Sequence, residues 1–366
     1  MTIHYKKDSQ DQQFLNALRQ RVNLYFKANA LKKTGTTFSY IKAALLLTAY
    51  VLAAIAVFYS SAAWQLYLCY ALMGNLTIFV ALNIAHDAAH STFSSRRWMN
   101  DLLLYALDAL GANGYIWKLK HVHSHHPHVN IPDMDGDIKQ SNLVRIFPNA
   151  RFLKFHRFQY LYMPVLYAFY TLIWLCIRDF KDFFSGTISG KPDHQHPRME
   201  YVKLFLGKAL FFSRMLLLPY WLLPFSFGQI LLGFLFFHVV ASYTTMLVLI
   251  SAHIGEHSVY PAPDADGQLP HSWIRHQLIT TTDFATGSWL ATQLFGGFNH
   301  HVVHHIFPNI CHVHYPQITK ILIQTCHDFG MPYQSTPTFA SAALSHLRFL
   351  KLRSQQNRPV AYPDDM

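Results

Sequence analysis

The chain is poor in charged residues and in cysteine. Only 13% of its 366 residues are Asp, Glu, Lys or Arg, while 51% are hydrophobic and 15% are aromatic. This balance excludes a disordered chain and differs from that of an ordinary soluble domain. The four cysteines form no Cys-x-x-Cys pair. We therefore expect free thiols in a reducing compartment, without an iron–sulfur cluster or a cysteine-bound zinc.

Several functional motifs are missing as well. The chain has no Gly-x-Ser-x-Gly and no His-Glu-x-x-His, which argues against hydrolysis. The net charge is +11, but the basic residues form no nucleic-acid-binding motif. They lie beside apolar runs, where basic residues mark the cytoplasmic side of a membrane segment and contact anionic lipid headgroups. No short apolar core with a cleavage site follows the polar N-terminus, so we expect no secretory signal peptide. We expect the chain to interact with the lipid bilayer and not with nucleic acid.

Histidine, by contrast, occurs in three clusters at helical spacing. Side chains three or four residues apart project from one face of a helix. The clusters have the spacings i, i+4; then i, i+4, i+5; then i, i+3, i+4. Their members are His86 and His90, then His121, His125 and His126, then His301, His304 and His305. Three clusters of this kind favour a metal site over a surface helix that happens to be rich in histidine.

Eight candidate ligands are too many for one metal ion. Four ligands satisfy a structural zinc, so two metal ions, each with an open position, are the economical interpretation. His253, at the inner end of an apolar run, is the natural ninth ligand, and the alternative is a polar residue that marks the end of a membrane helix. Spacing alone leaves the metal open, because non-haem iron suits oxygen chemistry and zinc suits hydrolysis.

Five apolar stretches are long enough to be candidate membrane segments. Residues 41–60 and 66–85 each approach the ~20 residues that a bilayer requires. Residues 160–177, 204–225 and 229–251 follow. All three histidine clusters must share one side of the membrane if they form one centre, so an even number of crossings separates the second cluster from the third. One of the last three stretches therefore does not span.

We expect residues 160–177 to lie in the membrane interface, because they contain Pro164 and are flanked by charge. The last two stretches then form a second hairpin, with its first crossing centred on residues 210–225. Residues 91–157, which hold the second cluster, are basic and are placed in the cytoplasm by the positive-inside rule. The sequence predicts an all-α integral membrane protein: four transmembrane helices in two hairpins, interfacial helices and a cytoplasmic histidine-rich cap.

The order and spacing of the clusters closely resemble those of the membrane-bound fatty acid desaturases, from the first apolar run to Pro316. Flanking residues add to the resemblance, namely Trp117, residues 135–138, Phe298, Asn299 and residues 306–316. Residues 271–285 are similar to the bacterial branch near linoleoyl-CoA and front-end desaturases. His301 is a departure, because front-end members typically carry glutamine at that position.

The resemblance implies a non-haem di-iron centre that uses O2 and two electrons to introduce a cis double bond into an acyl chain. The implied substrate is an acyl-lipid or an acyl-CoA. No His-Pro-Gly-Gly motif of a fused cytochrome b5 domain occurs. The electrons are therefore expected to come from a separate donor of ferredoxin or cytochrome b5 type.

Two alternatives remain open at this point. A di-iron hydroxylase or ketolase of fatty acids, sphingolipids or carotenoids shares the histidine clusters, so only product analysis separates it from a desaturase. A non-enzymatic haem or metal-transport protein is the weaker alternative. It would need histidines deep in facing helices or polar residues along the spans, whereas the clusters lie at membrane ends.

Polar residues near the clusters are expected to orient the ligands. They are Asp87, Asp135, Asp137, His276 and Asn299, and helix caps and turns are the alternative explanation. The candidates for contact with the substrate or its headgroup are Trp117, Lys118 and Lys120, for which a solvated inner face is the alternative.

The chain divides into a cytoplasmic N-terminal arm (1–40), a membrane desaturase domain with the di-metal cap (41–347) and a polar C-terminal tail (348–366). The distribution of basic residues places both termini and all three histidine clusters in the cytoplasm. The resemblance to the bacterial branch implies that the membrane is a bacterial inner membrane.

Overall fold

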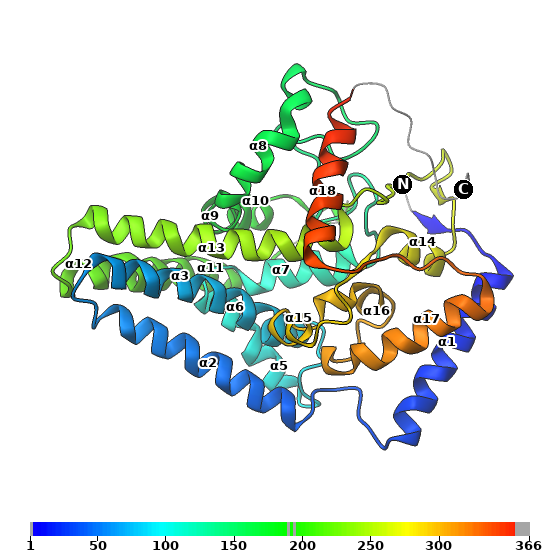
Figure 1. Cartoon of the computed structure of the whole chain (residues 1–366), viewed down its shortest axis with the longest axis horizontal. Coiled ribbons are helices and arrows are strands. Elements are labelled where there is room, and N and C mark those ends of the chain that lie inside the picture. Colours follow the sequence, from blue (N-terminus) through cyan, green and yellow to red (C-terminus); the bar gives the residue numbers. More distant parts are fainter. Residues whose placement is uncertain (1–2, 189–190, 193–194, 356–366) are drawn as a thin grey trace.

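Long apolar helices form one end of the molecule, and shorter helices gather toward the other end (Figure 1). The computed structural model describes residues 3–188, 191–192 and 195–355. The end of the predicted C-terminal tail, residues 356–366, lies outside this part of the chain. The preceding residues continue the last helix, α18, which spans Phe339–Arg353.

Three of the apolar helices form one packed layer, in which the second lies between the other two. They are α2 (Thr37–Val57), α3 (Ala63–Val80) and α13 (Phe227–His253). The backbones of α3 and α13 touch, because a Cβ added to Gly74 would lie 2.5 Å from the carbonyl oxygen of Phe237. Small residues permit this close approach of helices in a membrane. The core between the helices contains Tyr70 and Phe237, both buried.

Four helical segments of the described chain are long and apolar enough to cross a membrane. They are Thr37–Val57, Ala63–Ala89, Lys154–Phe183 and Phe227–His253. Three of them match predicted crossings. The fourth is the stretch that we expected to lie in the interface, whereas the expected crossing at residues 204–225 does not qualify. Its two internal cations, Lys208 and Arg214, make it less apolar, while the charges of residues 154–183 stand near the ends.

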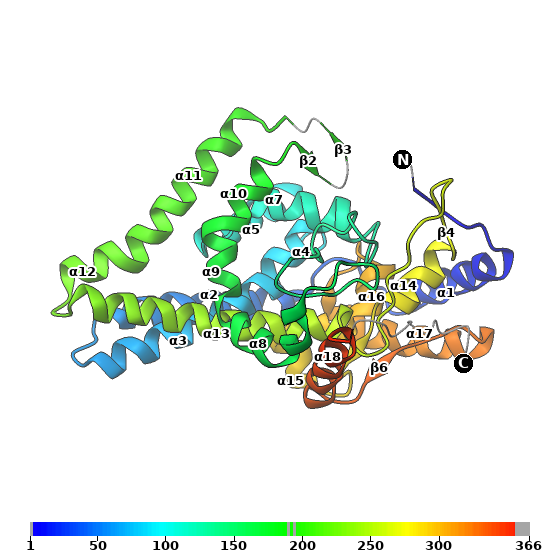
Figure 2. The same cartoon turned by 90° about the horizontal axis from the view of Figure 1, so that it is seen from above.

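The segment Lys154–Phe183 is irregular. It consists of a 3-10 turn at Lys154–Phe158, α8 (Gln159–Leu166), a 3-10 turn at Tyr167–Phe169, α9 (Tyr170–Ile173), a π-helical turn at Trp174–Arg178 and α10 (Asp179–Phe183). Pro164 lies inside α8 and cannot donate a backbone hydrogen bond. The segment runs across α13 in both views (Figures 1 and 2). At the crossing, the Thr171 Oγ1 lies 2.9 Å from Nδ1 of His238 and the Thr171 N–H donates to Ser242 Oγ.

A second long helical stretch leads into α13. It comprises α11 (Arg198–Phe212), a π-helical turn at Ser213–Leu217 and α12 (Leu218–Leu222). The turn from α12 to α13 and the turn from α2 to α3 lie at the same end of the molecule (Figures 1 and 2). Within residues 204–225, both cations are paired: Lys208 Nζ lies 2.5 Å from Asp179 Oδ2, and Arg214 donates to the Tyr50 hydroxyl at 3.0 Å.

The remaining elements surround the histidines. The helices are α1 (Ser9–Ala28), α4 (His86–Ala89), α5 (Arg97–Leu104), α6 (Ala106–Ala109), α7 (Gly114–Lys120), α14 (Trp273–Thr280), α15 (Trp289–Leu294), α16 (His301–Ile306) and α17 (Tyr315–Phe329). Three short strand pairs occur in the described chain: β1 (His4–Tyr5) with β4 (Gln268–Leu269), β2 (Thr187–Ile188) with β3 (Lys191–Pro192), and β5 (Asp283–Phe284) with β6 (Ser335–Thr336). The first and third of these pairs join segments that are distant in the sequence. The first and third pairs are parallel and the second is antiparallel.

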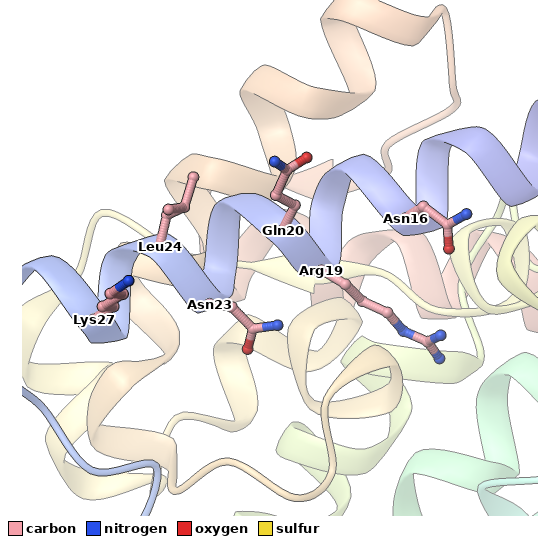
Figure 3. A pocket seen from close by; sticks show the side chains of 6 residues that line it. All are labelled: Asn16, Arg19, Gln20, Asn23, Leu24 and Lys27. Carbon is pink, nitrogen blue, oxygen red and sulfur yellow. The ribbon is translucent and has the colours of Figure 1, made fainter.

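The N-terminal helix α1 closes the end of the molecule opposite the two hairpin turns (Figure 1). Its buried face, with Phe14, Leu18 and Val22 at helical spacing, packs in one core with α14, α16 and α17. The Asp8 carboxylate caps the helix and accepts from the N–H groups of residues 10 and 11. The outward face of α1 carries a shallow polar pocket (Figure 3) lined by Asn16, Arg19, Gln20, Asn23, Leu24 and Lys27.

Candidate metal centre

Two of the three histidine clusters are placed by π-helical turns. The turn Ala81–Ala85 ends α3 immediately before His86, and the turn His121–His125 contains most of the second cluster. In the latter, the N–H of His126 bonds the carbonyl of His121 at 3.2 Å. A π turn inserts one residue into a helix and often occurs at functional sites. The side chains that follow each turn are thereby rotated toward the same interior space.

The third cluster approaches the first through two glycines. Gly296 and Gly297 have φ angles of +55° and +70°, which favour glycine. A Cβ on Gly296 would lie 2.4 Å from the carbonyl oxygen of Leu82, in the π turn before the first cluster. The backbone of this loop therefore rests directly on the inner end of α3. Helix α16, with all three histidines of the third cluster, begins four residues later.

All nine predicted ligands converge. One group of ring nitrogens, within 4.8 Å of one another, comes from His86, His90, His121 and His304; a second comes from His125, His253, His301 and His305. We call these group one and group two. His126 lies between them, with its ring centroid 4.5 Å from those of both His304 and His305. Each group combines histidines from clusters that are far apart in the sequence.

The nitrogen spacings within each group match a coordination sphere. In group one, the Nε2 of His86 lies 3.2 Å from the Nε2 atoms of both His121 and His304. In group two, the Nε2 of His301 lies 2.8 Å from that of His253 and 3.3 Å from that of His305. Tetrahedral ligands at ~2.0–2.1 Å from a metal stand about 3.3 Å apart.

The outer nitrogens of several rings face acceptors, which fixes where the proton resides. The Nδ1 of His121 lies 2.9 Å from Asp137 Oδ2, and the Nδ1 of His125 lies 2.9 Å from Asp135 Oδ1. The Nδ1 of His305 lies 3.2 Å from Gln277 Oε1. An imidazole that donates from Nδ1 presents the lone pair of Nε2.

These lone pairs face one another, which suits a cation. The Nε2 of His301 stands between His253 and His305, and both of those rings direct Nδ1 at an acceptor: the Thr280 carbonyl at 3.4 Å for His253, and Gln277 for His305. At most one proton can be shared among the three facing nitrogens. The Nδ1 of His301 and the Nε2 of His90 are buried and lack a hydrogen-bond partner within the described chain. The residues present therefore fit a metal pair.

Electrostatics also favours the neutral, metal-binding form of imidazole. Burial lowers the pKa of His301, His304 and His305 well below its usual value, and the neighbouring histidines add to this shift. For His125, burial also lowers the pKa, but the carboxylate of Asp135 outweighs this and the net pKa is raised. A ring held this way is a more basic ligand.

The five predicted orienting residues differ in what they contact. Asp135 and Asp137 each hold one ligand of the second cluster, as described above. Asp87 instead accepts from Cys311 Sγ at 2.9 Å and lies 2.6 Å from Nδ1 of His312, while its other oxygen stands 4.0 Å from Nδ1 of His86. His276 bonds the carbonyl of Val129 at 2.8 Å, and Asn299 bonds the carbonyl of Ala285 and the hydroxyl of Thr292. The last two brace the backbone around the site.

The predicted headgroup contacts also differ from one another. Trp117 stacks on His121, with centroids 4.8 Å apart and planes 12° apart, so it forms a wall of the centre. Lys118 is half-buried. Lys120 is only 4% exposed and is ion-paired with Asp182, and its pKa is lowered to about 8 by burial first and by Arg178 second. This buried pair does not suit a headgroup contact for Lys120.

Three contributors were not predicted from spacing. Tyr315 places its hydroxyl 3.1 Å from Nδ1 of His304, Gln277 faces His305, and Asn130 lies beneath group two. Gln277 lies in the stretch that resembles the bacterial desaturases and directly follows His276, which was the available clue. Nothing in local spacing points to Tyr315 or Asn130, because their contacts depend on how distant segments pack.

The fold and this site define a mostly helical protein with four helical segments that could cross a membrane and a histidine-rich site that could hold metal. Comparison with known proteins supplies the family. The model of the fatty acid desaturase family matches residues 62–337, so the chain belongs to that family. It is accordingly an oxygen-dependent oxidoreductase of lipid metabolism, which confirms the resemblance seen in the histidine clusters.

The relatives are similar along nearly all of the chain. An acyl-lipid (8-3)-desaturase of Physcomitrium patens is 30% identical over 353 residues, covering 96% of this chain and 73% of the relative. An sn-1 linoleoyl-lipid 6-desaturase of Synechocystis is 31% identical, covering 96% of this chain and 98% of the relative. The sn-1 linoleoyl-lipid 6-desaturase of Arthrospira platensis is 29% identical, with 93% and 92% covered.

Proposed function

We propose that the chain desaturates the fatty acyl chain of a membrane lipid at two iron ions held by the nine histidines. In the balanced reaction, two C–H bonds of a –CH2–CH2– unit, one O2, two electrons and two protons give –CH=CH– and two waters. The observation that supports this most directly is the convergence of Nε2 lone pairs in two adjacent groups. Acyl-lipid substrates are favoured over acyl-CoA because the similar proteins are acyl-lipid and linoleoyl-lipid desaturases.

The bound iron pair would supply the activation of O2. The protein residues then have three tasks. Asp135 and Asp137 hold the protons of His125 and His121 on Nδ1 and so keep both rings in the ligating tautomer. Phe298 and Trp117 cover the centre with apolar surface: the Phe298 ring lies 4.7 Å from His86 and 4.9 Å from His301. Such walls exclude water and limit side reactions of a strong oxidant.

We further propose that the chain crosses the membrane in two hairpins, α2 with α3, and α11–α12 with α13. Three observations support this topology. Both hairpin turns lie at one end of the molecule (Figures 1 and 2). Large exposed aromatic residues occur at two levels, as in the aromatic belts at the two membrane surfaces. Tyr59, Trp64 and Trp221 lie at or beside the turns, and Trp98 and Trp289 belong to α5 and α15, which lie away from the turns (Figure 1). Lys208 and Arg214, the two cations within residues 204–225, are paired within the protein, which reduces their cost in a membrane.

In this arrangement the segment Lys154–Phe183 lies in the interface. Its outer side exposes Leu161, Val165, Phe169 and Ile173 at helical spacing, and it runs across α13 instead of beside it. The metal centre and both termini then face the cytoplasm of a bacterial cell, in keeping with the basic residues of this side. A separate ferredoxin or cytochrome b5-type protein would deliver the electrons there.

Product analysis tests the activity. The chain should be expressed in a host whose lipids lack polyunsaturated fatty acids, and the double bonds located by mass spectrometry. We expect new cis double bonds with the wild type and none with His304→Ala, although that variant should still insert in the membrane. Hydroxylated acyl chains would favour the hydroxylase alternative. Unchanged lipids in a host that supplies a competent donor would contradict the proposal.

A further inference from the structure

Asn130 occupies a special backbone position just after the second histidine cluster. It is completely buried and has a φ of +58°. Among L-residues, asparagine is one of the few that tolerates this left-handed conformation. A buried amide in such a turn needs specific partners, because an unpaired polar group in the interior is costly. Its partners lead in two directions, to two different ligands of group two.

The backbone of Asn130 leads to His125. Its N–H donates to Asp135 Oδ2 at 2.9 Å. The same carboxylate lies 2.9 and 3.0 Å, through its two oxygens, from Nδ1 of His125. Asn130 therefore helps to hold the carboxylate that holds this ring.

The side chain of Asn130 leads to His253. Its amide nitrogen lies 3.3 Å from the carbonyl of His253, 3.1 Å from that of Val259 and 3.3 Å from that of Thr280. The Thr280 carbonyl also faces Nδ1 of His253 at 3.4 Å. Two amide protons are thus shared among three carbonyls, which join the end of α13 to the end of α14 beneath the ring of His253.

From these contacts we propose that Asn130 is a positioning residue for group two. It orients His125 through the Asp135 carboxylate. It orients His253 through two backbone carbonyls, that of His253 itself and that of Thr280, which faces Nδ1 of His253. In group one, His121 is held by the Asp137 carboxylate and His304 by Tyr315, and the side chain of Asn130 contacts neither. The link between the two groups is the Asp137 N–H, which donates to Asp135 Oδ1 at 2.8 Å and does not involve the Asn130 amide. The proposal rests on the proposed function, in that group two is taken to hold one of two metal ions. It goes further, because it predicts that the affinity for one of the two metal ions depends on Asn130 more than the affinity for the other.

The chemistry of the site explains why the residue is an asparagine. Every group around the side-chain nitrogen is an acceptor, so a donor is required. Aspartate has nearly the same shape and also tolerates a positive φ, but its carboxylate would face three carbonyl oxygens. Glycine keeps both the turn and the backbone N–H to Asp135 and removes only the amide. The two substitutions therefore isolate the side-chain contribution.

The test is ferrous iron binding to the full-length chain in detergent, without substrate or electron donor. The variant is Asn130→Gly and its matched control is Asp133→Gly, since Asp133 lies in the same loop with a φ of +63° but is exposed. Loss of a residue that supports a ligand typically weakens metal binding by roughly 10–100-fold. We expect this loss for one of two bound ions in Asn130→Gly, and two unchanged sites in Asp133→Gly.

Asn130→Asp should show the same selective loss, which covers the case in which the glycine variant does not fold. Equal weakening of both ions, or two unchanged sites in the variants that fold, would overturn the role of Asn130 and leave the proposed function intact. A wild-type chain that binds no pair of iron ions would overturn both. The titration of the wild type therefore tests whether the chain binds two iron ions. The comparison of Asn130→Gly with Asp133→Gly tests the role of Asn130.

Discussion

The Nε2 atoms of His253 and His301 lie 2.8 Å apart, although the residues belong to different helices and are separated by 48 positions in the chain. Both side chains are buried, at 4% and 1% exposure. The Nδ1 of His253 faces the Thr280 carbonyl and carries the proton, so the lone pair on Nε2 of His253 is directed at His301. Crowded lone pairs in a dry interior are unfavourable without a cation between them.

Removing the metal should therefore destabilise the protein. We expect chelation of iron to lower the midpoint of thermal unfolding in detergent, and re-addition of ferrous iron to restore it. A ligand at 100 times its Kd stabilises the folded state by about 2.7 kcal/mol. Mg²⁺ is the control, because it prefers oxygen ligands and should not restore the midpoint. An unchanged midpoint after chelation would argue against a bound metal.

The two loop carboxylates should act on different ions. Asp137→Ala removes the partner of His121 in group one, and Asp135→Ala removes the partner of His125 in group two. Each should weaken its own ion by roughly 10–100-fold. Asp137→Ala should spare the other ion, and Asp135→Ala should affect the other ion less than its own, through the lost acceptor of the Asp137 N–H. Spectra of the Co²⁺-substituted protein would show whether the two variants lose different bands. Loss of the same band in both would contradict the assignment of groups.

Gly296→Ala should be strongly destabilising. The new Cβ would stand 2.4 Å from the Leu82 carbonyl, and the φ of +55° strains any residue with a side chain. We expect a loss of about 2 kcal/mol or more, together with weaker iron binding, because the loop joins the first and third clusters. Gly287→Ala is the matched control: no atom lies within 4 Å of its Cβ. Equal effects of the two substitutions would contradict the close contact.

Helix α16 should depend on Asp283. Its Oδ1 accepts from the N–H of Val302 at 2.7 Å and its Oδ2 accepts from the Tyr333 hydroxyl at 2.7 Å. Asp283→Ala leaves a buried N–H without its acceptor, which costs about 1–3 kcal/mol. Asp283→Asn can keep one oxygen toward Val302 and should retain more of the thermal stability and of the iron. Identical losses in both variants would show that the hydrogen bond to the helix is not the cause.

Acidification should destabilise the protein through its buried histidines. Burial lowers the pKa of His346 to about 4, against about 6.5 for an exposed histidine. Between these values the unfolded chain binds the proton and the folded chain does not, so this contribution is fully present above pH 6.5 and falls as the pH decreases toward 4. The slope is up to about 1.4 kcal/mol per pH unit for each such group.

His346→Gln tests this pH dependence away from the metal centre. The midpoint of unfolding should fall less steeply between pH 6.5 and 4 than in the wild type. His327→Gln is the control, because its side chain is 84% exposed. A steeper slope in His346→Gln would contradict the assigned direction.

Much of the metal centre could be predicted from the sequence, because i, i+3 and i+4 spacing fixes which histidines share a helix face. The spacing predicted eight of the nine histidines that converge, and the ninth, His253, was predicted from its place at the inner end of an apolar run. Asp135 and Asp137 were predicted as polar residues near the clusters. Partners contributed by distant segments could not be predicted, since their contacts arise from packing. Tyr315 and Asn130 belong to this class.

The membrane segments were predictable to a lesser degree. Three apolar runs match helices that can cross a bilayer, because length and composition suffice to identify them. The choice between residues 154–183 and 204–225 depends on whether Lys208 and Arg214 are paired within the protein. Their partners, Asp179 and Tyr50, lie far away in the sequence, so a prediction from composition alone treats these cations as unpaired.

The π-helical turn Ala81–Ala85 makes the centre sensitive to the number of residues in α3 as well as to their identity. Successive residues of a helix are rotated by about 100°. Deleting one residue from this turn would preserve every histidine and still swing His86 and His90 away from their partners. Chimeras that join this α3 to the cap of a similar protein should therefore keep the residue count between Val80 and His86, even where the amino acids themselves are free to change.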